Sequence, residues 1–364
     1  MSTYEGIAGL PVRIEGYELQ HLSRPTSSGW DRHTALIRLH GGGEVGESED
    51  VWYDEAETLA FIEAGPVLDL TGPRTLDAVS SRLGEPDLFP HPSQPHAVHF
   101  RRWGFEAAVL DLALRQAGMS LADALGRPVR PVNYVLSLRL GEPASAAPLR
   151  ERLSAHPDMT FKLDPTPDWT DAVVADILAL GRDRVRVLDF KALYESERVA
   201  MEPDADLYRR CLEAWPEAWI EDPHLTLNVR PILAPHMDRV TWDAPLRSLA
   251  SVTDLAHTPR MINIKPCRFG SLRELMSVYD HCEANRIGMY GGGFFELGPA
   301  RGQIQYLASL FHPEGSNDVA PRGFHWPHPG AGIPGSPLAP AARATGFAWT
   351  DADPPPADSP SASA

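Results

Sequence analysis

The sequence predicts an α/β protein in which a barrel of alternating strands and helices follows an N-terminal α+β unit. Residues 131–325 contain seven short β-rich runs, and most of the segments between them look helical. Seven strands in regular alternation with helices indicate a parallel sheet, which at this size favours closure into a barrel. Residues 1–130 have a different pattern, with strand-like runs first and helical segments after them.

The N-terminal unit is predicted from two strand-like runs, LPVRIEGYELQHL and HTALIRLHGG, on either side of the turn-rich SRPTSSGWDR. The longest helix candidate, FRRWGFEAAVLDLALRQAG, repeats apolar residues at helical spacing and stops at Gly118. A second helical turn, SLADALG, follows directly. The unit therefore contains both strands and helices.

The barrel strands are predicted to be VNYVLSLRL, MTFKLD, RVRVLDF, AWIED, RVTWDA, MINIKP and IGMYGG. The clearest helices between them are DWTDAVVADILALG, DADLYRRCLEAW and SLRELMSVYDHCEAN. After the barrel, we expect residues 326–350 to pack back on the N-terminal unit. Residues 351–364 are rich in Pro, Ala and Ser, and we expect them to be disordered.

The amino-acid composition indicates which kind of partner the protein binds. The 364 residues carry 33 basic and 49 acidic side chains, a net charge of -16, which argues against a nucleic-acid or anionic-membrane surface and favours a small metabolite. The three cysteines form no CxxC pair, so neither a disulfide framework nor a thiolate zinc site is indicated. The first residues lack a basic region followed by an apolar stretch, and no window approaches the length of a membrane span, so we expect no export and a reducing cytoplasm.

Charged residues mark the ends of five consecutive strand candidates: Lys162, Asp189, Glu221, Asp243 and Lys265. The carboxyl ends of barrel strands converge on one mouth, where catalytic groups of such enzymes lie. Three carboxylates packed there repel one another and need protons or a metal ion. All-oxygen ligands favour Mg²⁺, with Mn²⁺ next. A partly desolvated lysine beside a metal has a lowered pKa and can act as a base near neutral pH.

Each of these residues also has an ordinary structural interpretation. An acidic residue at a strand end is often a turn residue or a helix N-cap, and lysines usually lie in solvent. Three carboxylates in consecutive units, and apolar neighbours around both lysines, favour a functional site. A metal-free Schiff-base enzyme with Lys162 or Lys265 as nucleophile is the rival class.

The order Lys, Asp, Glu, Asp, Lys on consecutive strands resembles the enolase superfamily, within it the subgroup of muconate lactonizing enzymes, o-succinylbenzoate synthases and dipeptide epimerases. The resemblance implies a modified TIM-type (β/α)7β barrel over residues 131–325 and an N-terminal α+β capping domain over residues 1–130. It also implies Mg²⁺ held by Asp189, Glu221 and Asp243, Lys265 as the base, and a homo-oligomer.

The implied reaction is abstraction of the proton alpha to the carboxylate of a small substrate, through an enediolate. Isomerisation, as in a racemase, epimerase or cycloisomerase, is the expected outcome. β-Elimination by the same half-reaction and a non-catalytic metal-binding descendant are the alternatives. The specificity residues implied by the resemblance lie in the loop from Arg24 to His33, with Arg24 and Trp30, and in the run from Tyr290 to Glu296.

Three strands depart from the pattern of that superfamily. The fifth usually ends Asp-Glu, whereas here Asp243 is followed by Ala244. The second usually carries Lys-x-Lys with a catalytic second lysine, whereas this chain has Lys162-Leu163-Asp164. The third usually reads Asp-x-Asn, and here a lysine, Lys191, takes the last place. Because residues two apart share a face of a strand, we hypothesise that Lys191 either pairs with Asp164 or supplies the second base. Lys162 could instead act alone on that face.

Overall fold

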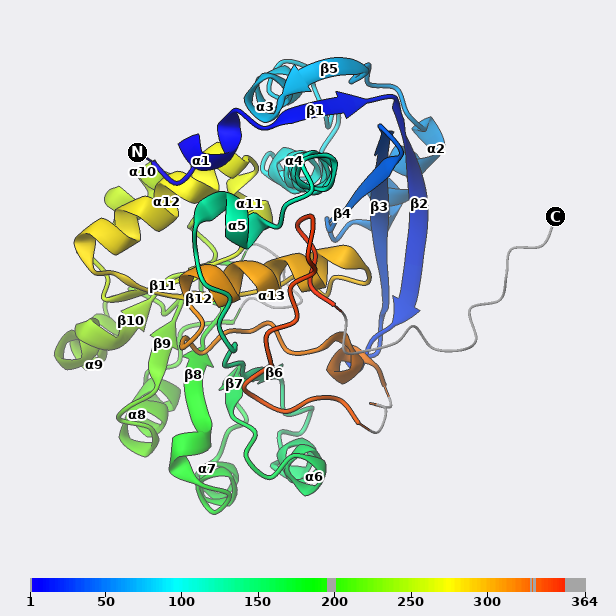
Figure 1. The fold of residues 1–364 in the computed structure, drawn as a ribbon. Helices are drawn as coiled ribbons and strands as arrows, with labels where there is room; N and C mark the ends of the chain where they lie inside the picture. Colours follow the sequence, from blue (N-terminus) through cyan, green and yellow to red (C-terminus); the bar gives the residue numbers. More distant parts are fainter. Residues whose placement is uncertain (1, 195–200, 328, 330–331, 351–364) are drawn as a thin grey trace.

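The computed structural model describes residues 2–194, 201–327, 329 and 332–350. An N-terminal α+β capping domain packs against a (β/α)7β barrel (Figure 1), which confirms the predicted fold class. Within the described residues, no helix combines the length and the hydrophobicity needed to cross a membrane.

The capping domain contains two small antiparallel sheets and five helices. One sheet has the order β2 (Gly16–Pro25), β3 (Asp31–Gly41) and β4 (Glu44–Asp50), and the other pairs β1 (Pro11–Ile14) with β5 (Gly72–Thr75). The helices are α1 (Glu5–Ala8), α2 (Glu55–Ala64), α3 (Leu76–Leu83), α4 (Ala97–Gln116) and α5 (Leu121–Leu125).

Two details of this domain differ from the prediction. The run LPVRIEGYELQHL is two strands, β1 and β2, separated at Glu15. Strand β4 was not predicted, because GEVGESED lacks the alternation of apolar and polar residues that marks a half-buried strand. Its burial comes from α4: a Cβ at Gly46 would lie only 2.3 Å from the carbonyl oxygen of Ala108. A glycine there lets sheet and helix approach closely.

Seven strands run in parallel around the barrel, as predicted. Five form one continuous sheet in the order β6 (Leu136–Leu138), β7 (Phe161–Leu163), β8 (Val185–Asp189), β9 (Trp219–Glu221) and β10 (Val240–Thr241). Strand β11 (Met261–Ile264) pairs in parallel with β12 (Gly288–Gly291). The ring is completed by a hydrogen bond of 3.0 Å from the Asn263 N–H to the Trp242 carbonyl, and by parallel bridges from Asn317 to Tyr134 and from Asp318 to Gly292.

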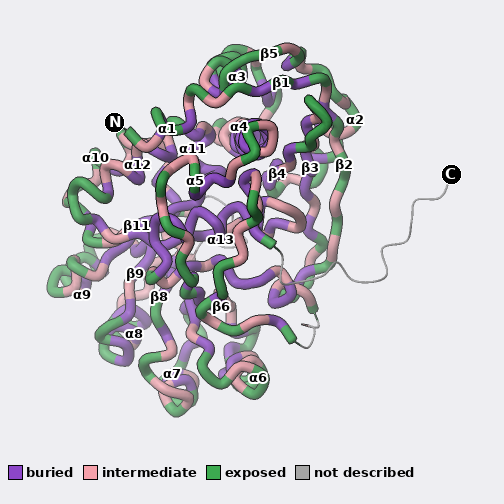
Figure 2. The backbone as a smooth tube through the Cα atoms, viewed as in Figure 1, coloured by how far each residue is buried: buried purple, intermediate pink, exposed green. Residues whose placement is uncertain are grey.

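Helices surround the strands on the outside of the barrel (Figure 1). They are α6 (Ala147–Ala155), α7 (Asp171–Leu178), α8 (Ala205–Ala214), α9 (Arg230–Leu233), α10 (Leu249–Thr253), α12 (Leu272–Asn285) and α13 (Pro299–Phe311). The short helix α11 (Pro266–Phe269) is buried between the end of β11 and α4. Buried positions follow the strands and the inner faces of these helices, whereas exposed positions lie on the outside (Figure 2). The strand ends that carry the charged residues therefore lie inside the molecule.

The C-terminal segment returns to α4. The Phe347 N–H donates to Asp111 Oδ1 at 2.7 Å, and the Phe347 ring lies 6.4 Å from that of Trp103. Residues 351–364, predicted to be disordered, lie outside the described residues.

One buried arginine joins the capping domain to the barrel. Arg32, in β3, has no exposed surface and donates through Nε to the carbonyl of Phe294 at 3.1 Å, in the loop after β12. Its remaining N–H groups donate to the carbonyls of His33, Val51 and Trp52. A single guanidinium thus satisfies backbone acceptors of both domains.

Candidate active site

The three strand-end carboxylates are buried together at the carboxyl ends of neighbouring strands. Asp189 ends β8, Glu221 ends β9, and Asp243 follows β10 by two residues; none exposes more than 1% of its surface. Oxygen atoms of Asp189, Glu221 and the adjacent Asp222 lie within 4.8 Å of one another. This donor set, all oxygen and negatively charged, fits a hard divalent cation such as Mg²⁺.

All three lysines of the chain lie at this site, while the other 30 of its 33 basic residues are arginines. Lys162 Nζ lies 2.9 Å from Asp189 Oδ2 and contacts Glu221 Oε1. Lys265 Nζ lies 3.0 Å from Asp243 Oδ2. Because an arginine cannot be deprotonated in a protein and a lysine can, this distribution points to a chemical role for the lysines.

Lys191 lies between two carboxylates. Its ammonium contacts Asp189 Oδ2 and lies 3.5 Å from Asp164 Oδ1. The pairing with Asp164 proposed from the sequence is therefore present, together with a contact to Asp189 that the sequence did not suggest.

Asp243 is held by three side chains. Besides Lys265, Arg268 donates to its Oδ1 at 2.9 Å and the Tyr194 hydroxyl donates to its Oδ2 at 2.7 Å. Neither Arg268 nor Tyr194 was predicted from the sequence. Arg268 could have been found from its place in the short helix directly after Lys265, whereas Tyr194 lies in a loop without a recognisable pattern.

Asp222, also missed, supports the main chain at Asp243. Its two carboxylate oxygens accept the backbone N–H groups of Asp243 at 2.9 Å and of Ala244 at 2.8 Å. Its φ of +44° lies outside the β region, so its side chain does not follow the alternation of faces expected in a strand. A sequence argument that assumes a regular strand end cannot place such a residue.

Glu221 receives hydrogen bonds from two further barrel residues. The Tyr290 hydroxyl donates to Oε2 at 2.5 Å and the Asn263 amide donates to Oε1 at 3.2 Å. Tyr290, which was expected to contact substrate, is fully buried, with its hydroxyl on Glu221. Asn263 lies two residues before Lys265 and was not predicted.

The carboxylates of the site differ in pKa, which is raised in Glu221 and Asp222 and lowered in Asp189. Burial, with Asp189 and Asp243 nearby, raises the pKa of Glu221 to about 8 although Lys162 opposes the shift. Burial and the neighbouring Asp243 raise the pKa of Asp222 to about 7. Burial would also raise the pKa of Asp189, but Lys162 and Lys191 hold it well below its ordinary value. Because Glu221 and Asp222 retain protons near neutral pH, the site can bind additional positive charge in their place.

The lysines do not have the lowered pKa that the sequence analysis expected. Burial lowers the pKa of Lys162, of Lys191 and of Lys265, but their carboxylate partners outweigh it and raise all three above the ordinary value. The expectation concerned a lysine beside a bound metal ion, and it did not count the carboxylates that each lysine contacts. A divalent ion sharing those carboxylates would oppose this effect.

The residues expected to determine specificity lie where the capping domain meets the loop after β12. The Trp30 ring lies 5.8 Å from Tyr53 and 5.6 Å from Phe295. The Phe294 ring, in turn, lies 4.7 Å from Lys265 Nζ. Phe294 therefore lies beside the candidate base, and the Tyr53 ring of the capping domain lies 5.4 Å from the Phe294 ring.

The other two expected specificity residues have protein partners. The Arg24 guanidinium stacks 4.0 Å above the Trp326 ring. Glu296 pairs with Arg301 at 2.8 Å and accepts the Phe294 N–H at 2.7 Å. Glu296 therefore helps to fix the loop that carries Phe294.

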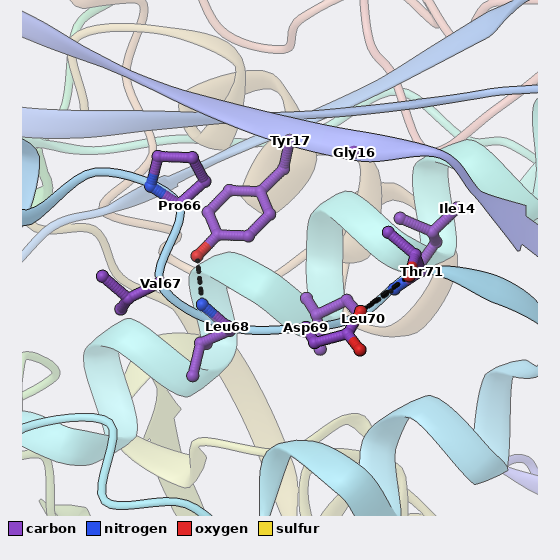
Figure 3. Close-up of a pocket in the computed structure, with 9 residues that line it drawn as sticks. All are labelled: Ile14, Gly16, Tyr17, Pro66, Val67, Leu68, Asp69, Leu70 and Thr71. Atoms are coloured by element: carbon purple, nitrogen blue, oxygen red, sulfur yellow. Dashed lines mark hydrogen bonds between the residues drawn. The ribbon is translucent and has the colours of Figure 1, made fainter.

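Two surface cavities lie away from these charges. One, of about 370 Å³, is a groove of the capping domain beside Tyr17, whose hydroxyl accepts the Leu68 N–H (Figure 3). The other, of about 360 Å³, is lined by residues at the amino ends of barrel strands, including Thr160 and Trp219. Barrel enzymes act at the carboxyl ends, so the buried charges are the better candidate.

Comparison with known proteins decides the family. A domain of unknown function, DUF8230, matches in both parts: its N-terminal domain over residues 5–124 and its C-terminal domain over residues 128–326. The chain belongs to the DUF8230 family. The DUF8230 chain is 25% identical over 315 residues to o-succinylbenzoate synthase of Bacillus subtilis, a match that covers 79% of this chain and 76% of the relative.

Solved structures show the fold. An enolase superfamily member from Listeria innocua superposes with a TM-score of 0.63 at 18% identity, over 86% of this chain and 87% of the other. A dipeptide epimerase from Methylococcus capsulatus, complexed with a Mg ion, gives 0.61 at 16% identity, over 86% and 88%. The DUF8230 protein therefore has the fold of enolase superfamily members.

Proposed function

We propose that this protein is a Mg²⁺-dependent enzyme that removes the proton alpha to the carboxylate of a small substrate and isomerises it through an enediolate. The observation that carries the proposal is the buried cluster of Asp189, Glu221 and Asp243, with Lys162 on one side and Lys265 on the other. The similarity to an o-succinylbenzoate synthase and to a Mg-complexed dipeptide epimerase supports it.

Asp189, Glu221 and Asp243 would hold the metal ion. We favour Asp243 over Asp222 as the third ligand because both Asp222 oxygens already accept main-chain N–H groups, whereas Asp243 is bound only by side chains that can move. When bound, Mg²⁺ supplies positive charge to the substrate carboxylate as negative charge develops there.

Lys265 is the proposed base. Its amine must lose a proton to act, and among the described residues its one carboxylate contact, to Asp243, opposes that loss less than the two carboxylate contacts of Lys162 do. The Phe294 ring 4.7 Å from Nζ limits the access of water to the amine.

Lys162 has a different proposed role. It is almost fully buried and paired with two carboxylates, so it remains an ammonium ion near neutral pH. In that state it stabilises negative charge on the substrate rather than removing a proton. The same protonation argues against Lys162 as the nucleophile of a Schiff-base enzyme, which needs a neutral lysine.

The proposal is tested by solvent deuterium exchange. Carboxylic acids of several classes (N-acylamino acids, dipeptides, acid sugars and lactones) are incubated with enzyme and Mg²⁺ in D₂O and followed by ¹H NMR. We expect exchange at the α-carbon of the correct class. The absence of exchange across the panel, with Mg²⁺ bound, would favour a non-catalytic descendant.

Lys265→Arg is the matched variant. It keeps a positive charge beside Asp243 but cannot act as a base. We expect it to bind Mn²⁺ and to lose exchange on the face that Lys265 serves, whereas exchange at the wild-type rate would show that the base is another residue. Whether the enediolate is reprotonated or eliminates a β-substituent depends on the substrate, and product analysis separates isomerase from lyase.

A further inference from the structure

The side chain of Lys191 is brought back onto its own strand. Its φ of +53° lies in the left-handed region, which a lysine rarely adopts. In this conformation its backbone N–H donates to Asp189 Oδ1 at 3.2 Å and its ammonium contacts Asp189 Oδ2. The next residue is fixed as well, because the Ala192 N–H donates to the Asp222 carbonyl at 3.1 Å. The contact between Lys191 and Asp189 is thus supported by the backbone.

This contact uses an oxygen that the proposed metal ion also needs. Asp189 Oδ2 already has the Lys162 ammonium at 2.9 Å, and the Lys191 ammonium contacts the same atom. A divalent cation at this carboxylate would meet two positive charges. Like charges at such distances oppose one another strongly in a buried site.

Lys191 has a second position open to it. Asp164 Oδ1 is buried, accepts no hydrogen bond from the described residues, and lies 3.5 Å from the Lys191 ammonium. Asp164 does not belong to the proposed ligand set. A small movement of the lysine side chain would exchange one carboxylate partner for another without exposing an unpaired charge.

We propose that Lys191 and Asp164 together set the affinity of the site for its metal ion. The Lys191 ammonium competes with the metal for Asp189, and Asp164 relieves the competition by accepting the ammonium when the metal binds. This inference rests on the proposed function, because it assumes that Asp189 is a metal ligand.

The proposal predicts opposite changes in Mn²⁺ affinity for two variants, Lys191→Met and Asp164→Asn. Lys191→Met removes the competing charge, and a charge at this distance changes the proton affinity of a carboxylate by about one to three powers of ten. We expect it to tighten Mn²⁺ binding by about tenfold or more, on the same reasoning. Asp164→Asn leaves Lys191 with Asp189 alone and should weaken binding several-fold. The double variant should bind like Lys191→Met, because Asp164 acts through the lysine.

Isothermal titration with Mn²⁺ measures these affinities on the full chain. Arg210→Met and Asp171→Asn are matched controls, since Arg210 and Asp171 form an ion pair of 2.6 Å at the surface. They make the same charge changes outside the site and should leave the affinity unchanged. Circular dichroism and the melting temperature show whether each variant is folded.

A second measurement follows Lys191 itself. Since the chain has only three lysines, protein labelled with ¹³C at lysine Cε gives three signals, which Lys→Met variants assign. Mg²⁺ should move the Lys191 signal in the wild type, and this change should be altered in Asp164→Asn.

The outcomes separate the two proposals. Mn²⁺ binding that is the same in the wild type, Lys191→Met and Asp164→Asn would overturn the competition while leaving the proposed function intact. Weaker binding in Lys191→Met would also overturn it. If no folded variant binds Mn²⁺ or Mg²⁺, the proposed function fails, and the inference fails with it.

Discussion

Asp222 accepts the backbone N–H of Asp243 at 2.9 Å and thereby holds in place the strand end that carries a proposed metal ligand. The two residues follow neighbouring strands, β9 and β10, and both are buried. One carboxylate thus has a structural function and the other a proposed chemical one.

Replacing each of these residues by asparagine should distinguish the two functions. Asp222→Asn loses a buried acceptor for one backbone N–H, which we expect to cost about 1–3 kcal/mol in the free energy of unfolding. Asp243→Asn should reduce Mn²⁺ affinity more than Asp222→Asn does. Urea unfolding and calorimetric titration measure the two effects. If Asp222→Asn abolishes metal binding and Asp243→Asn does not, Asp222 is the third ligand.

Lys162→Met should destabilise the metal-free protein. The lysine pairs with Asp189 and Glu221 in a site with almost no exposure, and removing one partner of a buried ion pair costs about 3–5 kcal/mol. Mg²⁺ should recover part of this loss, because the freed carboxylates then bind the ion. Urea unfolding with and without Mg²⁺ checks this, and a loss that Mg²⁺ leaves unchanged would count against a metal at these carboxylates.

The raised pKa of Glu221 makes the stability of the metal-free protein depend on pH. Between its unfolded value near 4.5 and its folded value of about 8, the folded state binds the additional proton, so this group destabilises the fold progressively as pH rises through that range. Above about pH 8 to 9 its effect levels off.

Glu221→Gln isolates this contribution. Buried histidines with a lowered pKa, such as His312 at about 4, stabilise the fold as pH rises and would mask the effect in the wild type alone. The unfolding free energy of the wild type minus that of Glu221→Gln, measured in chelator, should therefore fall between pH 5 and 8. A difference that is flat or rises with pH would show that Glu221 is ionised throughout.

Arg32→Lys should weaken the attachment of the capping domain. An ammonium group cannot reproduce the fork with which the guanidinium reaches the carbonyls of Phe294, His33, Val51 and Trp52. Each buried carbonyl left without a donor costs about 1–3 kcal/mol, so we expect a loss of several kcal/mol in chemical unfolding. A variant as stable as the wild type would mean that water or the introduced ammonium group satisfies these carbonyls.

Much of the fold could be predicted because its signals are local. Short apolar runs marked the barrel strands, and the charges on five of them, Lys162, Asp189, Glu221, Asp243 and Lys265, do lie together in the structure. Strand β4 was missed since its burial comes from α4, a contact distant in sequence.

The details of the site could not be predicted, for two physical reasons. Asp222 and Lys191 have left-handed backbones, so the rule that residues two apart share a face fails where the strands end. The pKa of each lysine depends on which carboxylate its ammonium contacts, as Lys191 and Asp189 illustrate. Such pairings follow from three-dimensional distances, which residue spacing alone does not fix.

Because all lysines lie at the barrel mouth, the outer surface of the protein reacts differently with reagents that modify amines. Its positive surface charge consists of guanidinium groups, so an acylating or glycating reagent finds no lysine amine on the outside of the molecule. The lysine side chains expose at most 13% of their surface, at Lys191. Chemical modification of lysine would therefore be slow, and where it did occur it would act directly on the site.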